Sequence, residues 1–243
     1  MSIENNLIEK AKNNPDFLYI SGSNLYGTNI EISDIDLRGF FIPTIDYILG
    51  IKNCNSVDLE GDHKIYPLHR FLQLLLEGDP QNVESLFIPS DKIKVLTPIG
   101  KQILSYKTDF LSNKIYSRIM GYSNGEWRKA MAIQIFPKKR AKTEVEILGE
   151  LWNIFGDLDK EQKDKILYLL YKNREKEIIS SISGLGKKRK EQVKKYGYCS
   201  KSASHAIRLV QEVQELMETG KITFPRYNAS LLKDIRYGKI DKK

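Results

Sequence analysis

The sequence predicts an α+β fold, in which a segment rich in short strands comes before a segment that is helical nearly throughout. The first part has β-rich runs at 17–20, 35–42, 57–59 and 63–66, with turn-forming residues between them. From residue 99 onward, apolar residues recur at helical spacing. The two patterns indicate a mixed sheet with helices, followed by an all-helical region.

The first part begins with a strand at 17–20 that ends in Ser21-Gly22-Ser23. A second strand at 35–42 is closed by Pro43, and Gly61 separates the two short strands after it. A helix at 68–76 follows, because apolar residues recur there at steps of three and four. Gly78-Asp79-Pro80 is expected to end this helix.

The chain has 243 residues, which suits one large domain or two smaller ones that share a cleft. Pro89 and Pro98 bracket an expected linker at 89–98, so we expect a catalytic domain at 1–95 and a helical domain at 96–243. Helices are expected near 99–110, 112–134, 141–155, 160–182 and 200–219. The basic run 187–190 is expected to be a loop or a helix start, and to be either a solvated face or a phosphate contact.

Charge is distributed unevenly along the chain. Residues 1–95 carry 8 Lys/Arg against 14 Asp/Glu, whereas residues 96–243 carry 31 Lys/Arg against 17 Asp/Glu. An acidic part that could hold metal ions is therefore joined to a basic part that could hold phosphates.

Several classes of protein are disfavoured. No stretch approaches the roughly 20 apolar residues of a membrane span, and the first residues have no basic leader, so we expect a cytoplasmic protein without membrane partners. Cys54 and Cys199 form no CxxC pair, which argues against a disulfide framework. The three histidines lack the spacing of zinc ligands.

The most informative segment joins a Gly-Ser turn to a pair of aspartates. Gly22 allows a tight turn after the first strand, so that backbone N–H groups and the Ser23 hydroxyl can face a phosphate. Asp34 and Asp36 are two residues apart on an expected strand, and residues i and i+2 project from the same face. We therefore expect two carboxylates to converge on one point.

Two close carboxylates repel each other unless a cation lies between them, and oxygen ligands at this density suit Mg²⁺ or Mn²⁺. A site for two ions needs a third carboxylate from a neighbouring strand. Asp62, just before the expected strand at 63–66, is the first candidate, with Asp58 and Glu60 as competitors.

At these residues the sequence resembles the DNA polymerase β superfamily of nucleotidyltransferases, whose motif is a Gly-Ser turn followed by Asp-x-Asp. More of the chain resembles the RNA-ligase-associated, polymerase-β-like group. The segments that carry this resemblance are 22–27, 33–39, Asp62 with 66–72, 78–87, 121–123 and 201–209. Asp79 is a departure, because the group has Asn before this proline.

The resemblance implies a polymerase-β-like palm followed by a helical domain that closes over the nucleotide. It also implies that Asp34, Asp36 and Asp62 are both the catalytic residues and the ligands of two Mg²⁺ or Mn²⁺ ions. The expected substrate is an NTP, with ATP as the first choice. Gly22 and Ser23 are expected to bind the nucleotide.

The expected helix at 200–219 carries cationic or donor groups on one side of a helical wheel, namely Lys201, His205 and Arg208. We expect these three residues to bind the triphosphate, with a solvated face as the alternative. The opposite side of the wheel is apolar, and we expect it to be core: it carries Ala203, Ala206, Ile207, Val210, Val213 and Met217.

Three further residues have two readings each. Tyr26 is expected either to stack near a base or sugar of the nucleotide or to pack as a turn aromatic. Arg38 is expected either to contact a phosphate or to neutralise the acidic strand. Glu84 is expected either to cap a helix or to buttress the site.

The functional hypothesis is transfer of an NMP from an NTP to an acceptor hydroxyl, with pyrophosphate released. RNA is the first choice of acceptor, in RNA end repair or tRNA processing, because the second half of the chain is basic. Transfer to a protein or a small molecule is the alternative within the enzymes. A non-catalytic nucleotide-binding module is the alternative outside them. The sequence does not predict the oligomeric state.

Overall fold

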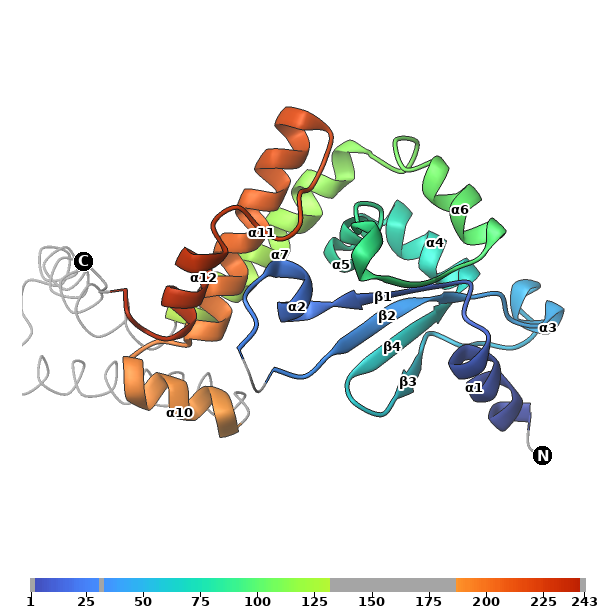
Figure 1. Cartoon of the computed structure of the whole chain (residues 1–243), viewed down its shortest axis with the longest axis horizontal. Helices are drawn as coiled ribbons and strands as arrows, with labels where there is room; N and C mark the ends of the chain where they lie inside the picture. Colours follow the sequence, from blue (N-terminus) through green and yellow to red (C-terminus); the bar gives the residue numbers. More distant parts are fainter. Residues whose placement is uncertain (1–2, 31–32, 132–186, 241–243) are drawn as a thin grey trace, which may run out of the picture. The chain divides into compact units, whose positions relative to one another are not determined.

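The computed structural model describes residues 3–30, 33–131 and 187–240 (Figure 1). The chain divides into two compact units. The first unit comprises Met1–Ser123 and Ile207–Lys233, and the second comprises Asn124–Ala206 and Asp234–Lys243. The first unit therefore uses two separate stretches of the chain, a division different from the expected one at 1–95 and 96–243.

A mixed five-stranded sheet forms the centre of the described part of the first unit, in the order β3-β4-β2-β1-β5. β1 is antiparallel to both β2 and β5, β2 is parallel to β4, and β3 is antiparallel to β4. The predicted sheet with helices is thus present. The strands are β1 (Phe17–Ser21), β2 (Asp36–Phe41), β3 (Val57–Leu59), β4 (His63–Pro67) and β5 (Ile93–Leu96).

The segment expected to be a linker at 89–98 contains β5, so that expectation was wrong. Phe17 lies opposite Leu96 and Leu18 opposite Val95, which makes β5 an edge strand of the sheet. The two prolines that suggested a linker lie just outside the strand. Pro89 precedes the 3₁₀ turn at Ser90–Lys92, and Pro98 is the first residue of a helix.

Each face of the sheet packs against different helices, as Figure 1 shows. Side chains alternate along β2, so Phe40 lies on one face and Phe41 on the other. Phe40 packs with Phe71 and Leu75 of α4 (Leu68–Leu76). The ring centroids of Phe40 and Phe71 are 4.7 Å apart. Phe41 belongs to the cluster on the opposite face, with Leu7 and Ala11 of α1 (Ile3–Asn13).

The helix predicted at 68–76 is confirmed as α4. It ends as expected, because Gly78 adopts a left-handed backbone with φ 74° that a side chain would strain. Asp79 then caps α5 (Pro80–Ser85) by accepting a hydrogen bond from the Asn82 N–H at 3.2 Å. The other helices of the described residues are α2 (Gly22–Tyr26), α3 (Ile45–Ile48), α6 (Pro98–Ser105), α7 (Asn113–Met131), α10 (Lys187–Tyr196), α11 (Ser200–Thr219) and α12 (Ala229–Arg236).

A second core in the first unit joins helices from both stretches of the chain. Leu25 of α2 and Val83 of α5 are buried there with Ile119 of α7 and Val213 of α11. The segment after α11 adds Phe224 to the same cluster. The Gly-Ser turn therefore rests on a core that is partly built from residues after 206.

The second unit is described over the end of α7, α10 and the start of α11. Cys199 is buried, and its N–H donates to the carbonyl of Ala130. The Tyr198 hydroxyl donates to the carbonyl of Ile235, a residue close to the end of the described chain, at 3.2 Å. The basic run at 187–190 is confirmed as a helix start, since α10 begins at Lys187. The helices expected at 141–155 and 160–182 lie outside the described residues.

The helix predicted at 200–219 is confirmed as α11, and its buried side was predicted in part. Ala203, Ala206 and Val213 of the expected core side are buried. Val210 and Met217 are 38% and 50% exposed, whereas Arg208 is 5% exposed. Leu209 and Leu216 fill the core instead. Arg208 can lie inside because its charge is paired there, as described below.

No helix among the described residues is long and apolar enough to cross a membrane.

Candidate active site

The Gly-Ser turn lies directly against the aspartate that begins β2. Gly22 has φ 64°, and a Cβ built on it would lie 1.9 Å from Oδ2 of Asp36. Only glycine allows this backbone conformation and this close approach together. Ser21, the last residue of β1, is the register partner of Asp36. The Gly-Ser turn is therefore in contact with one member of the aspartate pair, Asp36.

Asp34 and Asp36 do not share a strand as expected, because β2 begins only at Asp36. Asp34 is exposed and precedes the strand. Its backbone carbonyl accepts a hydrogen bond from Nδ2 of Asn24, a residue of α2, at 2.9 Å. Asn24 therefore ties the segment before β2 to the helix that carries the Gly-Ser turn.

Asp62 lies in the turn between β3 and β4 with φ 59°, a left-handed conformation that is uncommon for residues other than glycine. β2 and β4 are parallel, with Arg38 opposite Lys64. Asp36 comes two residues before Arg38 and Asp62 two residues before Lys64, so the two aspartates have equivalent positions along the paired strands. The first residue of β4, His63, fastens this edge, because its Nδ1 accepts a hydrogen bond from the Leu37 N–H at 3.2 Å. Asp36 and Asp62 thus lie at the same end of the sheet, where β2 and β4 begin.

The competitors for the third carboxylate are placed differently. Asp58 lies opposite Lys64 across the β3-β4 pair, and their side chains form a salt bridge of 3.1 Å. Glu60 is in the turn before Asp62. Of the three candidates, Asp62 alone directly precedes the strand that pairs with β2.

The carboxylates at this end of the sheet suit a divalent cation in their chemistry, but the described residues do not gather three of them. Within the described residues, no three His, Cys, Asp or Glu side chains lie close enough to form a metal-binding group. The donors at this end of the sheet are carboxylates, which suit Mg²⁺ or Mn²⁺. The Asp36 carboxylate occupies the space that a side chain at position 22 would otherwise take. The chemistry of the donors fits the ion, while the third ligand stays a prediction.

Arg38 follows Asp36 on the same face of β2 and lies among hydroxyl and carboxyl groups. It is the register partner of Tyr19, and its side chain forms a hydrogen bond with Tyr66. Burial raises the pKa of Tyr66, which Arg38 opposes. Burial likewise raises the pKa of Asp79. Arg38 therefore has neutralising contacts within the fold, and a phosphate contact remains a prediction.

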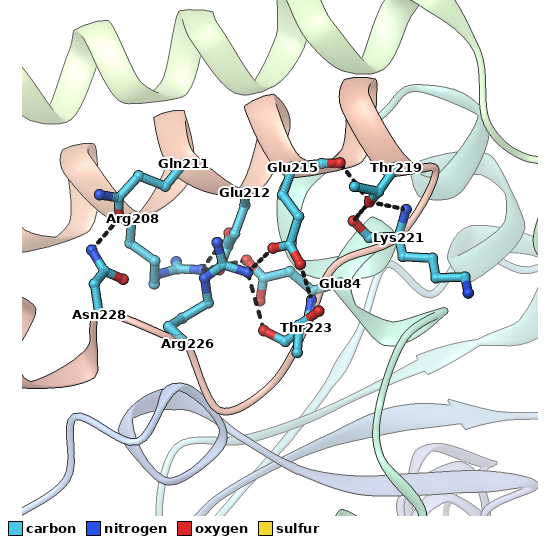
Figure 2. Close-up of polar contacts among 10 residues, drawn as sticks. All are labelled: Glu84, Arg208, Gln211, Glu212, Glu215, Thr219, Lys221, Thr223, Arg226 and Asn228. Atoms are coloured by element: carbon cyan, nitrogen blue, oxygen red, sulfur yellow. Dashed lines mark hydrogen bonds and ion pairs between the residues drawn. The ribbon is translucent and has the colours of Figure 1, made fainter.

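Tyr26, Glu84 and Arg208 form one buried cluster, seen in part in Figure 2. The Tyr26 hydroxyl donates to Oε2 of Glu84 at 2.7 Å, and Nη1 of Arg208 donates to Oε1 of Glu84 at 2.7 Å. The Arg208 guanidinium also lies over the Tyr26 ring, 3.7 Å from its centroid. Burial raises the pKa of Tyr26 well above its usual value. The buttressing role expected of Glu84 agrees with these contacts.

Lys201 and His205 belong to the second unit. Lys201 is exposed, while its backbone N–H donates to Oε1 of Gln192 at 3.3 Å. Burial tends to raise the pKa of Glu126, but hydrogen bonds with Lys129 and Ser202 and the charge of His205 hold it below its ordinary value. A role of Lys201 and His205 at the triphosphate remains a prediction.

The sequence interpretation missed three residues that the structure places in or behind the site. Asn24 carried no signal beyond its place after the Gly-Ser pair. Glu212 could have been found, because Arg208 and Glu212 have the i, i+4 spacing of a helical ion pair. Arg226 gave no local signal, since its partners come from α11 and from the turn before it.

A mixed sheet with a Gly-Ser turn packed against an aspartate at the start of the next strand is consistent with one class of protein, the nucleotidyltransferases with a polymerase-β-like fold. Comparison with known families narrows this class. The chain belongs to the RNA repair pathway DNA polymerase beta family, whose model matches residues 6–240. The resemblance seen in the sequence is therefore confirmed.

One similar curated protein comes from Enterobacteria phage T4, where it is described as an uncharacterized 38.9 kDa protein in the nrdC-mobD intergenic region. The two sequences are 23% identical over an alignment of 274 residues. The alignment covers 90% of this chain and 81% of the phage protein. No solved structure matches the chain.

Proposed function

We propose that this protein is a metal-dependent nucleotidyltransferase that moves an NMP from an NTP, ATP first among them, to an acceptor hydroxyl. The bond from the α-phosphorus to its bridging oxygen breaks, a bond to the acceptor oxygen forms, and pyrophosphate leaves. Membership of the polymerase β family supports the reaction class. The single observation that carries it is the Asp36 carboxylate held against Gly22 of the Gly-Ser turn.

Asp34, Asp36 and Asp62 are the residues that would hold two Mg²⁺ or Mn²⁺ ions. When bound, the ions would lower the pKa of the acceptor hydroxyl and neutralise charge on the triphosphate. The chain's own contribution is placement. Asp36 pairs with Ser21 of β1 and lies against Gly22 of α2, and Asp62 directly precedes β4, the strand paired with β2.

The remaining roles concern the nucleotide. In this proposal the backbone N–H groups of the Gly22-Ser23 turn and the Ser23 hydroxyl orient the phosphates, so that positioning and preorganised charge account for most of the catalysis. Lys201 and His205 neutralise the β and γ phosphates. Arg38, two residues after Asp36 on the same face of β2, partly offsets the negative charge of the carboxylates at this end of the sheet.

For the acceptor we propose RNA. The family description places its members in an RNA repair pathway, and residues 96–243 carry a large excess of basic over acidic residues. Transfer to a protein side chain or to a small hydroxyl compound uses the same chemistry and remains the alternative. A nucleotide-binding module without catalysis is disfavoured, because both aspartates of the Asp-x-Asp motif are present.

The test is incubation of the protein with each α-labelled NTP, Mg²⁺ or Mn²⁺, and RNA ends, in parallel with an Asp36→Asn variant. We expect label on RNA with the native chain and none with the variant, while circular dichroism shows both to be folded. Asp91 is an exposed carboxylate of the same unit, in the 3₁₀ turn before β5, and Asp91→Asn is the matched control, which we expect to keep full transfer.

Either of two results would contradict the proposal. Full transfer by Asp36→Asn would remove the assignment of the site. Label on protein, or on an added small hydroxyl compound, would keep the reaction but replace RNA as the acceptor.

A further inference from the structure

α2, the helix that carries the Gly-Ser turn, is too short to hold its own position. It has five residues, and its N-cap residue, Ser21, makes no side-chain capping hydrogen bond. Helices of this length are not stable in isolation, since their few hydrogen bonds do not offset the cost of ordering the first turn. The orientation of the Gly22-Ser23 turn must therefore be set by contacts with the rest of the fold.

These contacts come from behind the turn. The Tyr26 hydroxyl donates to Glu84 of α5, and the Arg208 guanidinium covers the Tyr26 ring. The backbone N–H of Arg226 donates to the Tyr26 carbonyl at 3.2 Å. The next residue, Gly27, has φ 75°, and a Cβ on it would lie 2.9 Å from Cβ of Pro225. The end of α2 is thus held by α5, α11 and the segment after α11.

The groups that hold α2 are linked to one another through buried charges, drawn in Figure 2. Nη1 of Arg208 donates to Glu84 and also to both carboxylate oxygens of Glu212, each at 2.7 Å. Nε of Arg226 lies 4.0 Å from Oε1 of Glu212, and its Nη1 donates to Glu215 and, at 3.0 Å, to the Thr223 carbonyl. We call Glu84, Arg208, Glu212 and Arg226 the buttress.

Stability alone does not explain the buttress. The side chains of Glu84, Arg208, Glu212 and Arg226 are 4%, 6%, 1% and 0% exposed. Burying charges costs several kcal/mol per ion, and well-packed apolar side chains often serve stability as well or better. Moreover, Nε and Nη2 of Arg226 are buried without a hydrogen-bond partner. What ion pairs provide beyond apolar packing is direction, because a guanidinium fixes its partners at defined angles.

We infer that the buttress residues are positioning residues for nucleotidyl transfer: they fix α2 so that the Gly22-Ser23 turn and the Asp36 carboxylate keep their geometry toward the nucleotide. This inference rests on the proposed function. It also changes the role of Arg208, which acts on α2 through Glu84 and Tyr26 and does not itself contact the triphosphate.

The test compares three variants with the native chain. Arg208→Met leaves Glu84 and Glu212 short of a partner, so it loses stability as well as geometry. Arg208→Met combined with Glu84→Gln removes one of the unpaired charges, so stability is partly restored while the link to α2 stays broken. Val57→Ala, in the core on the other face of the sheet, is the control for stability alone.

We expect kcat to fall by about 10- to 100-fold in both Arg208 variants, with little change in KM for the NTP, since a misplacement of about 1 Å has effects of this size. Val57→Ala keeps its kcat at temperatures well below its unfolding midpoint. Recovery of kcat together with stability in the double variant would overturn the inference. A rise in KM for the NTP with unchanged kcat in Arg208→Met would also overturn it, in favour of direct contact with the triphosphate.

A second measurement does not depend on activity. Amide hydrogen exchange over residues 22–28 is expected to quicken by about 10-fold or more in the double variant, while exchange in β4 is unchanged. Equal exchange at 22–28 in the double variant and the native chain would overturn the inference. If the native chain transfers no nucleotide, the proposed function fails, and the exchange measurement still decides whether the buttress positions α2.

Discussion

At Gly22, backbone conformation and the absence of a side chain serve the site together. The positive φ allows the chain to turn directly from β1 into α2, and the missing Cβ leaves room for the Asp36 carboxylate. Either requirement alone favours glycine at this position. Both together make Gly22 a residue through which the Gly-Ser turn and the Asp-x-Asp motif are coupled in space.

Replacing Gly22 with alanine should therefore disturb the site more than the fold. Alanine at φ 64° costs about 1 kcal/mol or somewhat more, and its Cβ would force Asp36 to move. We expect nucleotidyl transfer to fall by about 100-fold, as misplacement by about 1 Å can cause. Labelled-NTP assays and urea unfolding measure the two effects separately.

Gly121 is the matched control for this substitution. It lies within α7, and a Cβ on it would meet nothing within 4 Å. Alanine there should stabilise the helix by up to about 1 kcal/mol and leave transfer unchanged. Native transfer rates in Gly22→Ala would mean that the Asp36 carboxylate can move without loss of catalysis, against its assignment as a metal ligand.

At the scale of elements, periodic segments were predictable and segments defined by tertiary contacts were not. The helix at 68–76 and the strand at 57–59 were predicted to the residue, because their patterns are local. β5 was missed, because four residues between prolines become a strand only through pairing with β1. α2 was missed for a similar reason: five residues carry no helical period, and their contacts come from far along the chain.

The candidate site divides in the same way. Gly22, Ser23, Asp34 and Asp36 stand close together in sequence, so their motif could be recognised. The buttress joins Glu84 to Arg208 across 124 positions, and no spacing rule connects them. The helical wheel placed Arg208 on the exposed side of α11, because it treats every charge as solvated and cannot foresee a buried partner on another helix.

The charge of Glu212 within α11 should make stability depend on pH. Burial raises the pKa of Glu212 above its ordinary value, although the charge of Arg208 works against this shift. Over the pH range between the unfolded and the raised pKa, the folded chain binds more protons than the unfolded chain, so the free energy of unfolding falls as pH rises, by at most about 1.4 kcal/mol per pH unit. Glu212→Gln should remove this part of the dependence.

Urea unfolding at several pH values between 5 and 8 measures this slope. Glu218→Gln is the control, because Glu218 is an exposed glutamate of the same helix and its replacement should keep the native slope. Equal slopes in the native chain and Glu212→Gln would show that Glu212 stays ionised inside the fold over this range.

For the whole molecule, the uneven charge predicts how RNA binding responds to salt. Cations that contact phosphates release counterions, so the logarithm of affinity should fall linearly with the logarithm of salt concentration. Lys114 and Arg118 are exposed on α7 one turn apart. Alanine at both positions should weaken RNA binding and reduce the steepness of the salt dependence by roughly two.

The control for this measurement replaces two basic residues with alanine in the acidic part of the chain, residues 1–95. Lys12 and Lys94 are also exposed, and alanine at both should leave RNA binding near the native level. A flat salt dependence in the native chain would count against RNA as the acceptor.

The division of the first unit between Met1–Ser123 and Ile207–Lys233 has a consequence for how the protein is made. A ribosome completes the sheet, the Gly-Ser turn and Glu84 long before it reaches Arg208 and Arg226. Until then the Glu84 carboxylate lacks the arginine that pairs with it in the finished fold. A nascent or truncated chain that stops before residue 207 therefore carries every residue of the Asp-x-Asp motif, yet it lacks the cations that hold α2 in place.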